Sequence, residues 1–522
     1  MMETSTSLRI SPHLLRHSIH CAVSLPTMIV GLGLFLSAAR WFAYRLASAP
    51  PADERAGRQR IVLAACLLSV AALLVCGSNT VTSLLHAAEM PHAIAIEGGT
   101  LIDGTGRAPI SGAVILIEGD RIRSVGNHES VRIPKDAQII GARGKFILPG
   151  LIDCHCHLED VGLGDLGELP AEWATPDKLR ELTLDDARLD LAGGVTTVRD
   201  VGSTPLLFKV REEIESGKFP GPRVIAAGQQ LVKKSSKAYM DASFLEYDGA
   251  DDARQQVLHL VALGADLIKV RLTNQRPLPS LEEVRAIVAE AHHLGRRVTV
   301  HTDVPANEAV QLAIDAGVDG IEHNAPLRAG DAVLRQMAAK HMFLGTGMGG
   351  LYVQRYASGD PSSMVDDSAR RVFPPVVVSA LERAAVALQQ QTAEMKKQGW
   401  NPEKALGRGA RGMQQARRTG VLLGFGTDCG AELMIHGQQY KALYGETQMG
   451  SSPMEAILMA TRDAARILGQ ENDLGTVERG KFADLIIIDA NPLDDLRNVG
   501  KLHAVMKGGK LYREEKTSPS QP

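Results

Sequence analysis

The sequence lacks the features that mark several common classes of protein. Its formal net charge is only −3, and it has neither a basic arm nor the cysteine spacing of a zinc knuckle. Nothing therefore indicates nucleic-acid binding, and we expect no nucleic-acid partner. Its six cysteines contain no Cys-x-x-Cys pair and indicate no disulfide framework. Aromatic residues make up only 4% of the chain, which argues against an aromatic platform for sugars or bases.

Residues 1–90 contain two long apolar runs with a cluster of arginines between them. The first uncharged run lies between Arg16 and Arg40, and the second covers residues 61–88. The arginines and the second run are typical of a signal peptide that ends near Ala88. Two membrane spans joined by a cytoplasmic arginine-rich loop are the alternative. Both interpretations predict an exported or membrane-anchored protein with its catalytic domain outside the cytoplasm, and a misassigned start codon is a third explanation.

The stretch from Phe146 to His157 is the most informative part of the chain. It begins as an apolar strand and ends in Asp-Cys-His-Cys-His. Alternate side chains of a strand share one face, so His155 and His157 point the same way. Two imidazoles on one face at the end of a buried strand make half of a metal site. Two ordinary core histidines are the alternative, but the turn at Gly150 and the acid Asp153 favour the metal site.

This stretch resembles the first metal motif of the amidohydrolase superfamily. The resemblance rests on Leu148-Pro-Gly-Leu-Ile-Asp-Cys-His-Cys-His157 and extends over roughly residues 94–513. The branch that it resembles most contains imidazolonepropionase-like enzymes and prolidase-type metal-dependent dipeptidases. The resemblance implies a (β/α)8 barrel, a small β-sandwich domain and a site for divalent metal, expected to be two zinc ions.

The order of expected elements agrees with that fold. Strands and helices alternate over residues 148–473, which predicts a parallel sheet closed into a TIM-like barrel. Residues 91–147 and 474–515 are instead rich in short alternating strands with glycine turns, which predicts one β-domain built from both ends. The eight barrel strands are expected at residues 148–157, 194–200, 223–228, 266–271, 297–301, 320–324, 342–346 and 421–428.

Polar residues that could bind metal end several of these strands. In such barrels the carboxyl ends of the strands line the active site, and the superfamily places its metal ligands on the same strands. The candidate metal ligands are His155, His157, Lys269, His301, His323 and Asp428.

Lys269 decides between one and two metal ions. A lysine in an apolar strand has a depressed pKa, and its neutral amine can take up CO₂ to become a carbamate, an anion able to bridge two metals. The alternative is a lysine whose amine extends out from the strand end. Resemblance to the binuclear branch favours the carbamate, whereas an unmodified lysine would leave a single zinc ion on His155, His157, His301 and Asp428.

The candidate catalytic residues are Asp428, His323 and His436. Asp428 is expected to bind metal and to act as the base that accepts a proton from metal-activated water, with a helix N-cap as the alternative. His436 resembles a residue that the branch keeps near the substrate, and a solvated loop histidine is the alternative. Asp153 and Arg199 are candidates for orienting the ligands.

The expected function is metal-dependent hydrolysis of an amide, peptide or cyclic-amide C–N bond by metal-activated hydroxide. A lactonase or deaminase on the same site is the first alternative, and a non-catalytic, membrane-anchored binding scaffold is the second. The expected partner is a small-molecule or dipeptide-like substrate, and a homo-oligomer is compatible with the sequence. Residues 228–239 are polar and lysine-bearing where the prolidase-like enzymes carry a Gly/His-rich segment. Lys233, Lys234 or Arg271 could meet a substrate carboxylate there, with a solvated charge run as the alternative.

Overall fold

The structure is a computed structural model that describes residues 93–235, 242–273, 277–302, 306–347, 364–431 and 433–514. Residues 1–90, which carry the predicted signal peptide or membrane spans, lie outside these ranges. No helix in the described ranges is long and apolar enough to cross a membrane. The chain divides into residues 1–91 and residues 92–522, and the description below concerns the second unit.

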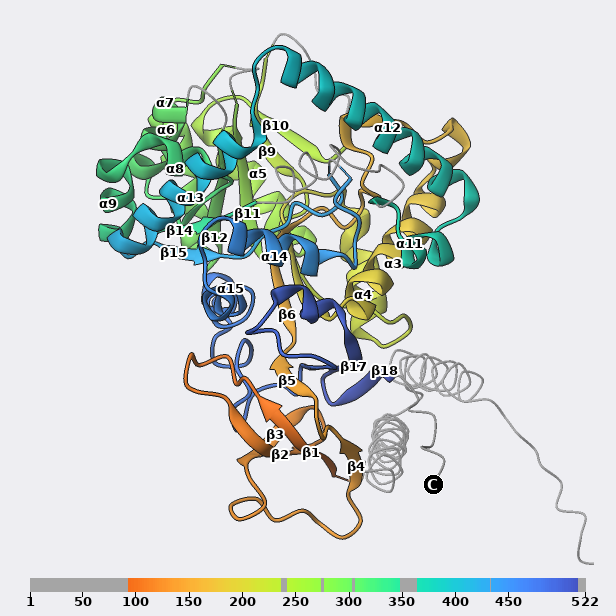
Figure 1. Cartoon of the computed structure of the whole chain (residues 1–522). Helices are drawn as coiled ribbons and strands as arrows, with labels where there is room; N and C mark the ends of the chain where they lie inside the picture. Colours follow the sequence, from red (N-terminus) through yellow and green to blue (C-terminus); the bar gives the residue numbers. More distant parts are fainter. Residues whose placement is uncertain are drawn as a thin grey trace, which may run out of the picture. The chain divides into compact units, whose positions relative to one another are not determined.

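Both ends of this unit build one mixed sheet (Figure 1). Its strands are β1 (Ile94–Leu101), β2 (Ile110–Glu118), β3 (Arg121–Gly126), β4 (Gln138–Gly141), β5 (Phe146–Pro149), β16 (Leu485–Ile488), β17 (Leu502–Lys507) and β18 (Lys510–Glu514). The strand order is β18-β17-β16-β5-β1-β2-β3, with β4 paired to β1. Ile122 of β3 and Met506 of β17 belong to the same buried core, so distant parts of this path come together. The expected β-sandwich is therefore one continuous sheet curled around its own core.

The central residues form the predicted barrel of parallel strands, and strands are present at all eight expected positions. These are β6 (Leu151–Cys156), β7 (Val195–Asp200), β8 (Arg223–Ala226), β11 (Leu267–Leu272), β12 (Arg297–Thr302), β13 (Gly320–Glu322), β14 (Phe343–Gly345) and β15 (Leu422–Gly424). Backbone hydrogen bonds close the ring: Asp266 N donates to Ala226 O and Cys154 N to Phe425 O, both at 2.8 Å. The TIM-like barrel is thus confirmed.

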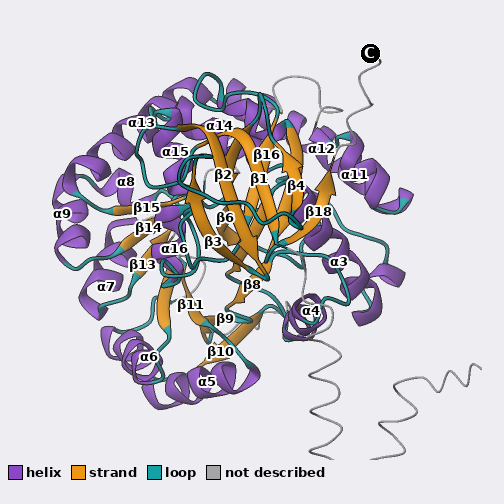
Figure 2. Ribbon diagram, turned by 90° about the horizontal axis from the view of Figure 1, so that it is seen from below, coloured by secondary structure: helices purple, strands orange, loops and turns teal. Residues whose placement is uncertain are grey.

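Helices surround these strands (Figure 2). They are α3 (Pro176–Ala192), α4 (Leu206–Glu215), α5 (Ala250–Leu263), α6 (Leu281–His293), α7 (Ala306–Ala316), α8 (Ala325–Ala329), α9 (Asp331–Ala339), α11 (Asp367–Val372), α12 (Pro375–Lys397), α13 (Pro402–Thr419), α14 (Gln439–Gln448), α15 (Pro453–Met459) and α16 (Arg462–Leu468). Short 3-10 turns are η2 (Gly164–Leu166), η3 (Ala171–Trp173) and η5 (Leu496–Gly500). Helix α6 shows why they form: Ser280 and Glu283 cap each other's backbone N–H groups at its start. Its apolar residues recur at helical spacing and are buried against the barrel.

Two additions to the barrel lie near the carboxyl ends of its strands. Strands β9 (Gln230–Lys233) and β10 (Phe244–Tyr247) pair in parallel and extend the sheet beside β11. Strand β9 lies within the polar segment, residues 228–239, that departs from the prolidase-like pattern. The long connection after β14 contains α11, α12 and α13, and α12 lies at the opposite end of the barrel from the β-domain (Figure 1). Connections of this length are usual for loops that shape an active site.

Candidate active site

One cavity of about 1020 Å³ opens at the carboxyl ends of the barrel strands. All six candidate ligands meet at this cavity, although the first and the last of them are 273 positions apart in the chain. His155, His157, Lys269, His301, His323 and Asp428 all line this cavity. Parallel strands of a closed barrel deliver their last residues to one rim, which explains why residues so distant in sequence meet there.

The ligand atoms lie close enough to share metal ions. Asp428 Oδ1 is 3.2 Å from His155 Nε2 and 3.3 Å from His157 Nε2, and Asp428 Oδ2 is 3.9 Å from His323 Nδ1. His155, His323 and Asp428 each offer one ligand atom, and these atoms lie within 4.8 Å of one another. The ring centroid of His301 is 4.6 Å from that of His323. Imidazole nitrogens with a carboxylate are the donors that zinc prefers, so this set fits a divalent ion.

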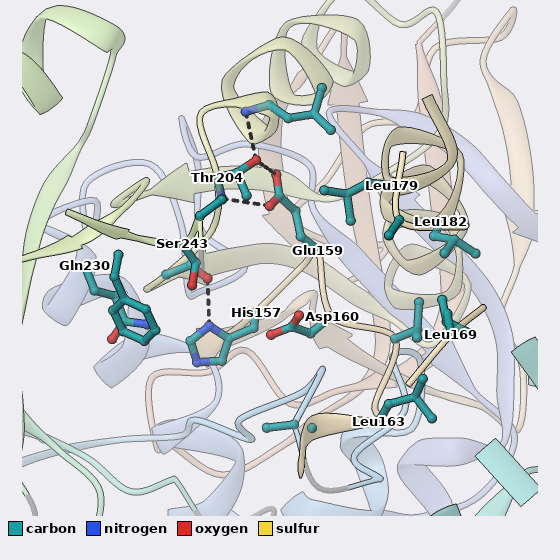
Figure 3. A pocket seen from close by; sticks show the side chains of 18 of the residues that line it. His157, Glu159, Asp160, Leu163, Leu169, Leu179, Leu182, Thr204, Gln230 and Ser243 are labelled. Carbon is teal, nitrogen blue, oxygen red and sulfur yellow. Dashed lines mark hydrogen bonds between the residues drawn. The ribbon is translucent and has the colours of Figure 1, made fainter. Parts of the chain in front are cut away.

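Hydrogen bonds to the protein fix two of the imidazoles in the orientation that metal binding requires. His155 Nδ1 lies 2.8 Å from Glu322 Oε2, and His157 Nδ1 lies 2.8 Å from the backbone oxygen of Gly202 (Figure 3). Because each acceptor takes a proton from Nδ1, Nε2 is the ring nitrogen left to bind a metal ion, and in both residues it faces Asp428. This pairing of a ligating ring with an outer acceptor is a regular feature of histidine–metal sites.

Glu322 is a site residue that the sequence interpretation missed. Its carboxylate is fully buried and accepts hydrogen bonds from Arg199 Nη2 and Thr299 Oγ1, each at 2.6 Å, in addition to His155. Burial alone would raise the pKa of Glu322, but the Arg199 guanidinium and His155 hold it well below its usual range. Glu322 therefore stays ionised beneath the site and orients His155.

An unusual backbone conformation explains why Glu322 was overlooked. In a regular strand Glu322 and His323 would face opposite sides. His323 instead has φ of 65°, in the left-handed region that non-glycine residues rarely adopt. Asp428, at the rim of the last strand, has φ of 61°. Both strained residues are candidate ligands, in keeping with the concentration of backbone strain at functional sites.

Small residues make room for these groups. A Cβ atom on Gly345 would lie 2.1 Å from Glu322 Oε2, and a Cβ on Gly426 would lie 2.7 Å from the Cβ of His155. Neither position can carry a side chain without moving a group of the site. Both glycines lie in or directly after barrel strands, where the sequence alone gave no reason to assign them a role.

Burial and neighbouring charges set the protonation of the site. Burial lowers the pKa of Lys269, which is 1% exposed, to about 8. Burial also lowers the pKa of His323, and the nearby His155 lowers it further, so that imidazole is neutral. Burial would raise the pKa of Asp428, but His155 and His157 hold it well below its usual range. The site thus offers a neutral imidazole, an ionised carboxylate and an amine that is easily deprotonated.

His436 does not occupy the position that either sequence interpretation expected. It is 1% exposed and is not among the residues that line the cavity. Its Nδ1 lies 2.9 Å from Asp190 Oδ2, and its Nε2 lies 3.2 Å from the backbone oxygen of His157. Both ring nitrogens are therefore engaged in supporting the His157 segment, and His436 is neither a solvated loop residue nor in reach of a substrate in the cavity.

The remaining cavity wall is apolar on one side. Leu163, Leu169, Leu179 and Leu182 surround this part of the cavity (Figure 3). Glu159 stands among them, and its carboxyl group accepts hydrogen bonds from Thr204 N at 2.7 Å and Thr204 Oγ1 at 3.0 Å. Burial raises the pKa of Glu159 to about 8. An apolar substrate group would thus meet hydrocarbon, beside the largely uncharged Glu159 and a second acid, Asp160 (Figure 3).

Comparison with known proteins agrees with this geometry. The profile of the Amidohydrolase family matches residues 146–512, which is more than half of the chain. The chain belongs to the amidohydrolase family. This amidohydrolase is 26% identical over 425 residues to a 5-methylthioadenosine/S-adenosylhomocysteine deaminase of Symbiobacterium thermophilum, covering 76% of this chain and 85% of the relative.

Two further proteins define the branch of the family. An imidazolonepropionase of Anaeromyxobacter dehalogenans is 26% identical over 443 residues, covering 78% of this chain and 91% of the relative. The crystal structure of a Xaa-Pro dipeptidase with bound methionine superposes with a TM-score of 0.62 at 27% identity, covering 80% of this chain and 99% of that one. The resemblance to the imidazolonepropionase-like and prolidase-type branch is confirmed.

Proposed function

We propose that this amidohydrolase uses divalent metal to hydrolyse a C–N bond of a small amide. The observation that carries the proposal is the convergence of His155, His157, His323 and Asp428, with the Nδ1 atoms of His155 and His157 bonded to protein acceptors. Such orientation of ligand rings serves metal binding and is not needed by a scaffold that only binds ligands. The membership of the family and the names of the relatives support hydrolysis at carbon–nitrogen bonds.

The proposed site holds two zinc ions on the six residues that line the rim of the barrel. When bound, the metal supplies a Lewis acid that polarises the substrate carbonyl and lowers the pKa of water. Asp428 acts as the base: its Oδ atoms accept a proton from the attacking water and deliver it to the leaving nitrogen. His323, held neutral by its surroundings, serves as a ligand on the opposite side of Asp428.

Lys269 has a separate role in this proposal. Its neutral amine attacks the carbon of CO₂, a new N–C bond forms, and the amine proton is released to solvent. The product is a carbamate whose oxygens add negative charge between the histidines. Two observations support the assignment: Lys269 is almost completely buried, and it lines the same cavity as the other candidate ligands. A buried ammonium beside divalent ions would be strongly disfavoured, whereas a carbamate would be attracted.

Metal analysis combined with a substrate screen tests the proposed function. The purified protein should contain about two equivalents of zinc, lose activity on chelation and regain it with added zinc. Dipeptides, N-acyl amino acids, cyclic amides and lactones form the screen. A metal-free protein that still bound one of these compounds tightly, without turnover, would favour the binding scaffold.

Deamination on the same site is the second candidate function. The observation in its favour is the likeness to the deaminase of Symbiobacterium thermophilum, which covers 85% of that protein. Ammonia release from adenine nucleosides, measured beside the amide screen, separates the two functions. Ammonia release with no cleavage of any amide would replace the first proposal by the second.

A further inference from the structure

Arg271 is a cavity residue to which the proposed chemistry gives no role. It lies two positions after Lys269 on β11, and alternate residues of a strand face the same side, so both point into the barrel. Arg271 lines the cavity, and its backbone is in register with His301 of the neighbouring strand β12. Its guanidinium group therefore belongs to the rim that carries the metal ligands.

This arginine has no anionic partner in the described part of the chain. No carboxylate there lies within ion-pairing distance of its guanidinium, and its buried Nε has no hydrogen-bond partner. The guanidinium carbon lies 5.6 Å from the ring centroid of Phe244, an uncharged neighbour. Nearby cations differ: Arg199 is paired with Glu322, and Lys233 with Glu283. Arg271 is thus an arginine of the cavity wall for which the described residues supply no anionic partner.

An open guanidinium donor is costly in a cavity wall. The Nε of Arg271 is buried away from water and has no partner in the described part of the chain, and a buried donor that makes no hydrogen bond loses its solvation without compensation. An anion that arrives with the substrate would satisfy the open Nε and pair with the guanidinium charge.

We propose that Arg271 binds the carboxylate of the substrate and makes the enzyme selective for N-acyl amino acids, including dipeptides with a free C-terminus. This inference rests on the proposed amide hydrolysis and names its substrate class. A guanidinium can hold a carboxylate through two parallel N–H···O bonds, which fixes both position and orientation.

The opposite wall fits the other half of such a molecule. Leu163, Leu169 and Leu182 follow the first barrel strand, whereas Arg271 is on the fourth, so the two features lie on different sides of the cavity. The candidate metal ligands line the same cavity. An N-acyl amino acid would place its carboxylate on Arg271, its scissile amide at the ligands and its apolar acyl group against the leucines.

The test compares a substrate with its decarboxylated counterpart. N-hexanoyl-L-leucine and N-hexanoyl-3-methylbutylamine have the same scissile amide, but only the first carries a carboxylate. Arg271→Met removes the charge, and Arg271→Lys keeps it without the forked geometry. Lys234→Met is the matched control, because Lys234 is a nearby cation that is 59% exposed and does not line the cavity.

Arg271→Met should reduce kcat/KM for the carboxylate substrate by about 10- to 100-fold, as expected for losing a hydrogen-bonded charged partner. It should change kcat/KM for the decarboxylated amide by less than about 3-fold. Arg271→Lys should fall between the wild type and Arg271→Met, and Lys234→Met should match the wild type. An equal loss on both substrates at unchanged zinc content would overturn the assignment of Arg271.

Binding separates this inference from the proposed function. Calorimetric titration of the zinc-loaded protein with N-hexanoyl-L-leucine should show weaker binding to Arg271→Met than to the wild type, whether or not the compound is cleaved. If neither compound is hydrolysed, amide hydrolysis of this class fails, and calorimetry alone decides the role of Arg271. Equal affinity of the two proteins, or no binding to the wild type, would then reject it.

Discussion

Replacing Glu322 with glutamine should disable the site without touching a candidate ligand. Glu322 is fully buried and receives three hydrogen bonds, from His155 Nδ1 at 2.8 Å and from Arg199 Nη2 and Thr299 Oγ1 at 2.6 Å. Glutamine has the same shape but only one acceptor oxygen. Arg199 and Thr299 both donate to the same carboxylate oxygen, so the amide oxygen of glutamine takes that place and its NH₂ faces His155.

The amide NH₂ then reverses the tautomer of His155. An NH₂ group can only donate, so Nδ1 must become the acceptor and the ring proton must move to Nε2. A protonated Nε2 has no lone pair for a metal ion. Loss of such an outer partner typically lowers metal affinity about 10- to 100-fold. Arg199 would also lose its carboxylate partner, and leaving one charge of a buried pair uncompensated costs about 3–5 kcal/mol of folding free energy.

Two assays measure these effects separately. Urea unfolding of the metal-free protein gives the change in free energy of unfolding, and competition with a chelating dye gives zinc affinity. Glu159→Gln is the matched control: Glu159 is also a buried acid of the cavity, but its pKa of about 8 means that it is largely uncharged at neutral pH. That change should cost less than about 1 kcal/mol and leave zinc affinity intact. Wild-type zinc affinity and stability in Glu322→Gln would refute the reasoning.

Three other predictions concern the proposed roles of single groups. Asp428→Asn should lower kcat by about 10²- to 10⁴-fold with little change in KM, as measured by steady-state kinetics. A decrease in kcat of less than a few-fold would mean that another residue is the base. Activation of metal-free protein by bicarbonate and zinc should become more effective as pH rises through about 8, because burial lowers the pKa of Lys269 to about 8 and only the neutral amine takes up CO₂. Lys269→Ala should show neither this activation nor its pH dependence, and short carboxylic acids should partly restore its activity. A chain truncated to begin near Glu89 should be soluble and active. Cell fractionation should find the full-length chain exported or in the membrane fraction, and active full-length protein confined to the cytosol would contradict this prediction.

The sequence predicted the barrel and its rim because both depend on a repeated pattern. Each barrel strand is a short apolar run, and parallel strands bring their carboxyl ends to one side, so His301 and Asp428 could be grouped before any contact was known. The curled form of the β-domain could not be predicted in the same way. Which edge strands meet depends on pairing between the two ends of the chain, and a pattern of alternation carries no information about that pairing.

The missed and misplaced residues depend on tertiary contacts. The role of Glu322 follows from the left-handed conformation of His323, which no local signal in the sequence requires. The position of His436 is decided by Asp190, a buried acid on α3 that is 246 positions away in the chain. Arg271 could be placed on the correct face from its spacing to Lys269. Which of the nearby cations lacks an anionic partner could not be predicted, because it depends on tertiary contacts: Lys233 lies beside Glu283 and Lys234 beside Asp248.

Two strand ends of the rim use the same arrangement to hold His155. At the end of β13, Glu322 fixes the ring of His155 through Nδ1, and the next residue, His323, is itself a candidate ligand. After β15, Thr427 donates to Asp153 Oδ2 at 2.5 Å, Asp153 Oδ1 accepts from His155 N at 3.1 Å, and the next residue is the candidate ligand Asp428. Glu322 therefore orients the His155 ring directly, and Thr427 supports the His155 backbone through Asp153. The second residue of each pair lines the cavity.

A regular strand could not present both members of such a pair, because neighbouring side chains would lie on opposite faces. The left-handed backbone at His323 and Asp428 breaks this alternation, so that both members of each pair can serve the site. Backbone strain of this kind costs of order 1–3 kcal/mol per residue and persists only where the surrounding structure enforces it. Backbone hydrogen bonds hold both residues in place: Asp428 N donates to His155 O at 2.8 Å, and His323 N donates to Gly345 O on β14, also at 2.8 Å. At Asp428 the bond that holds the strained residue thus also ties it to the strand that carries His155.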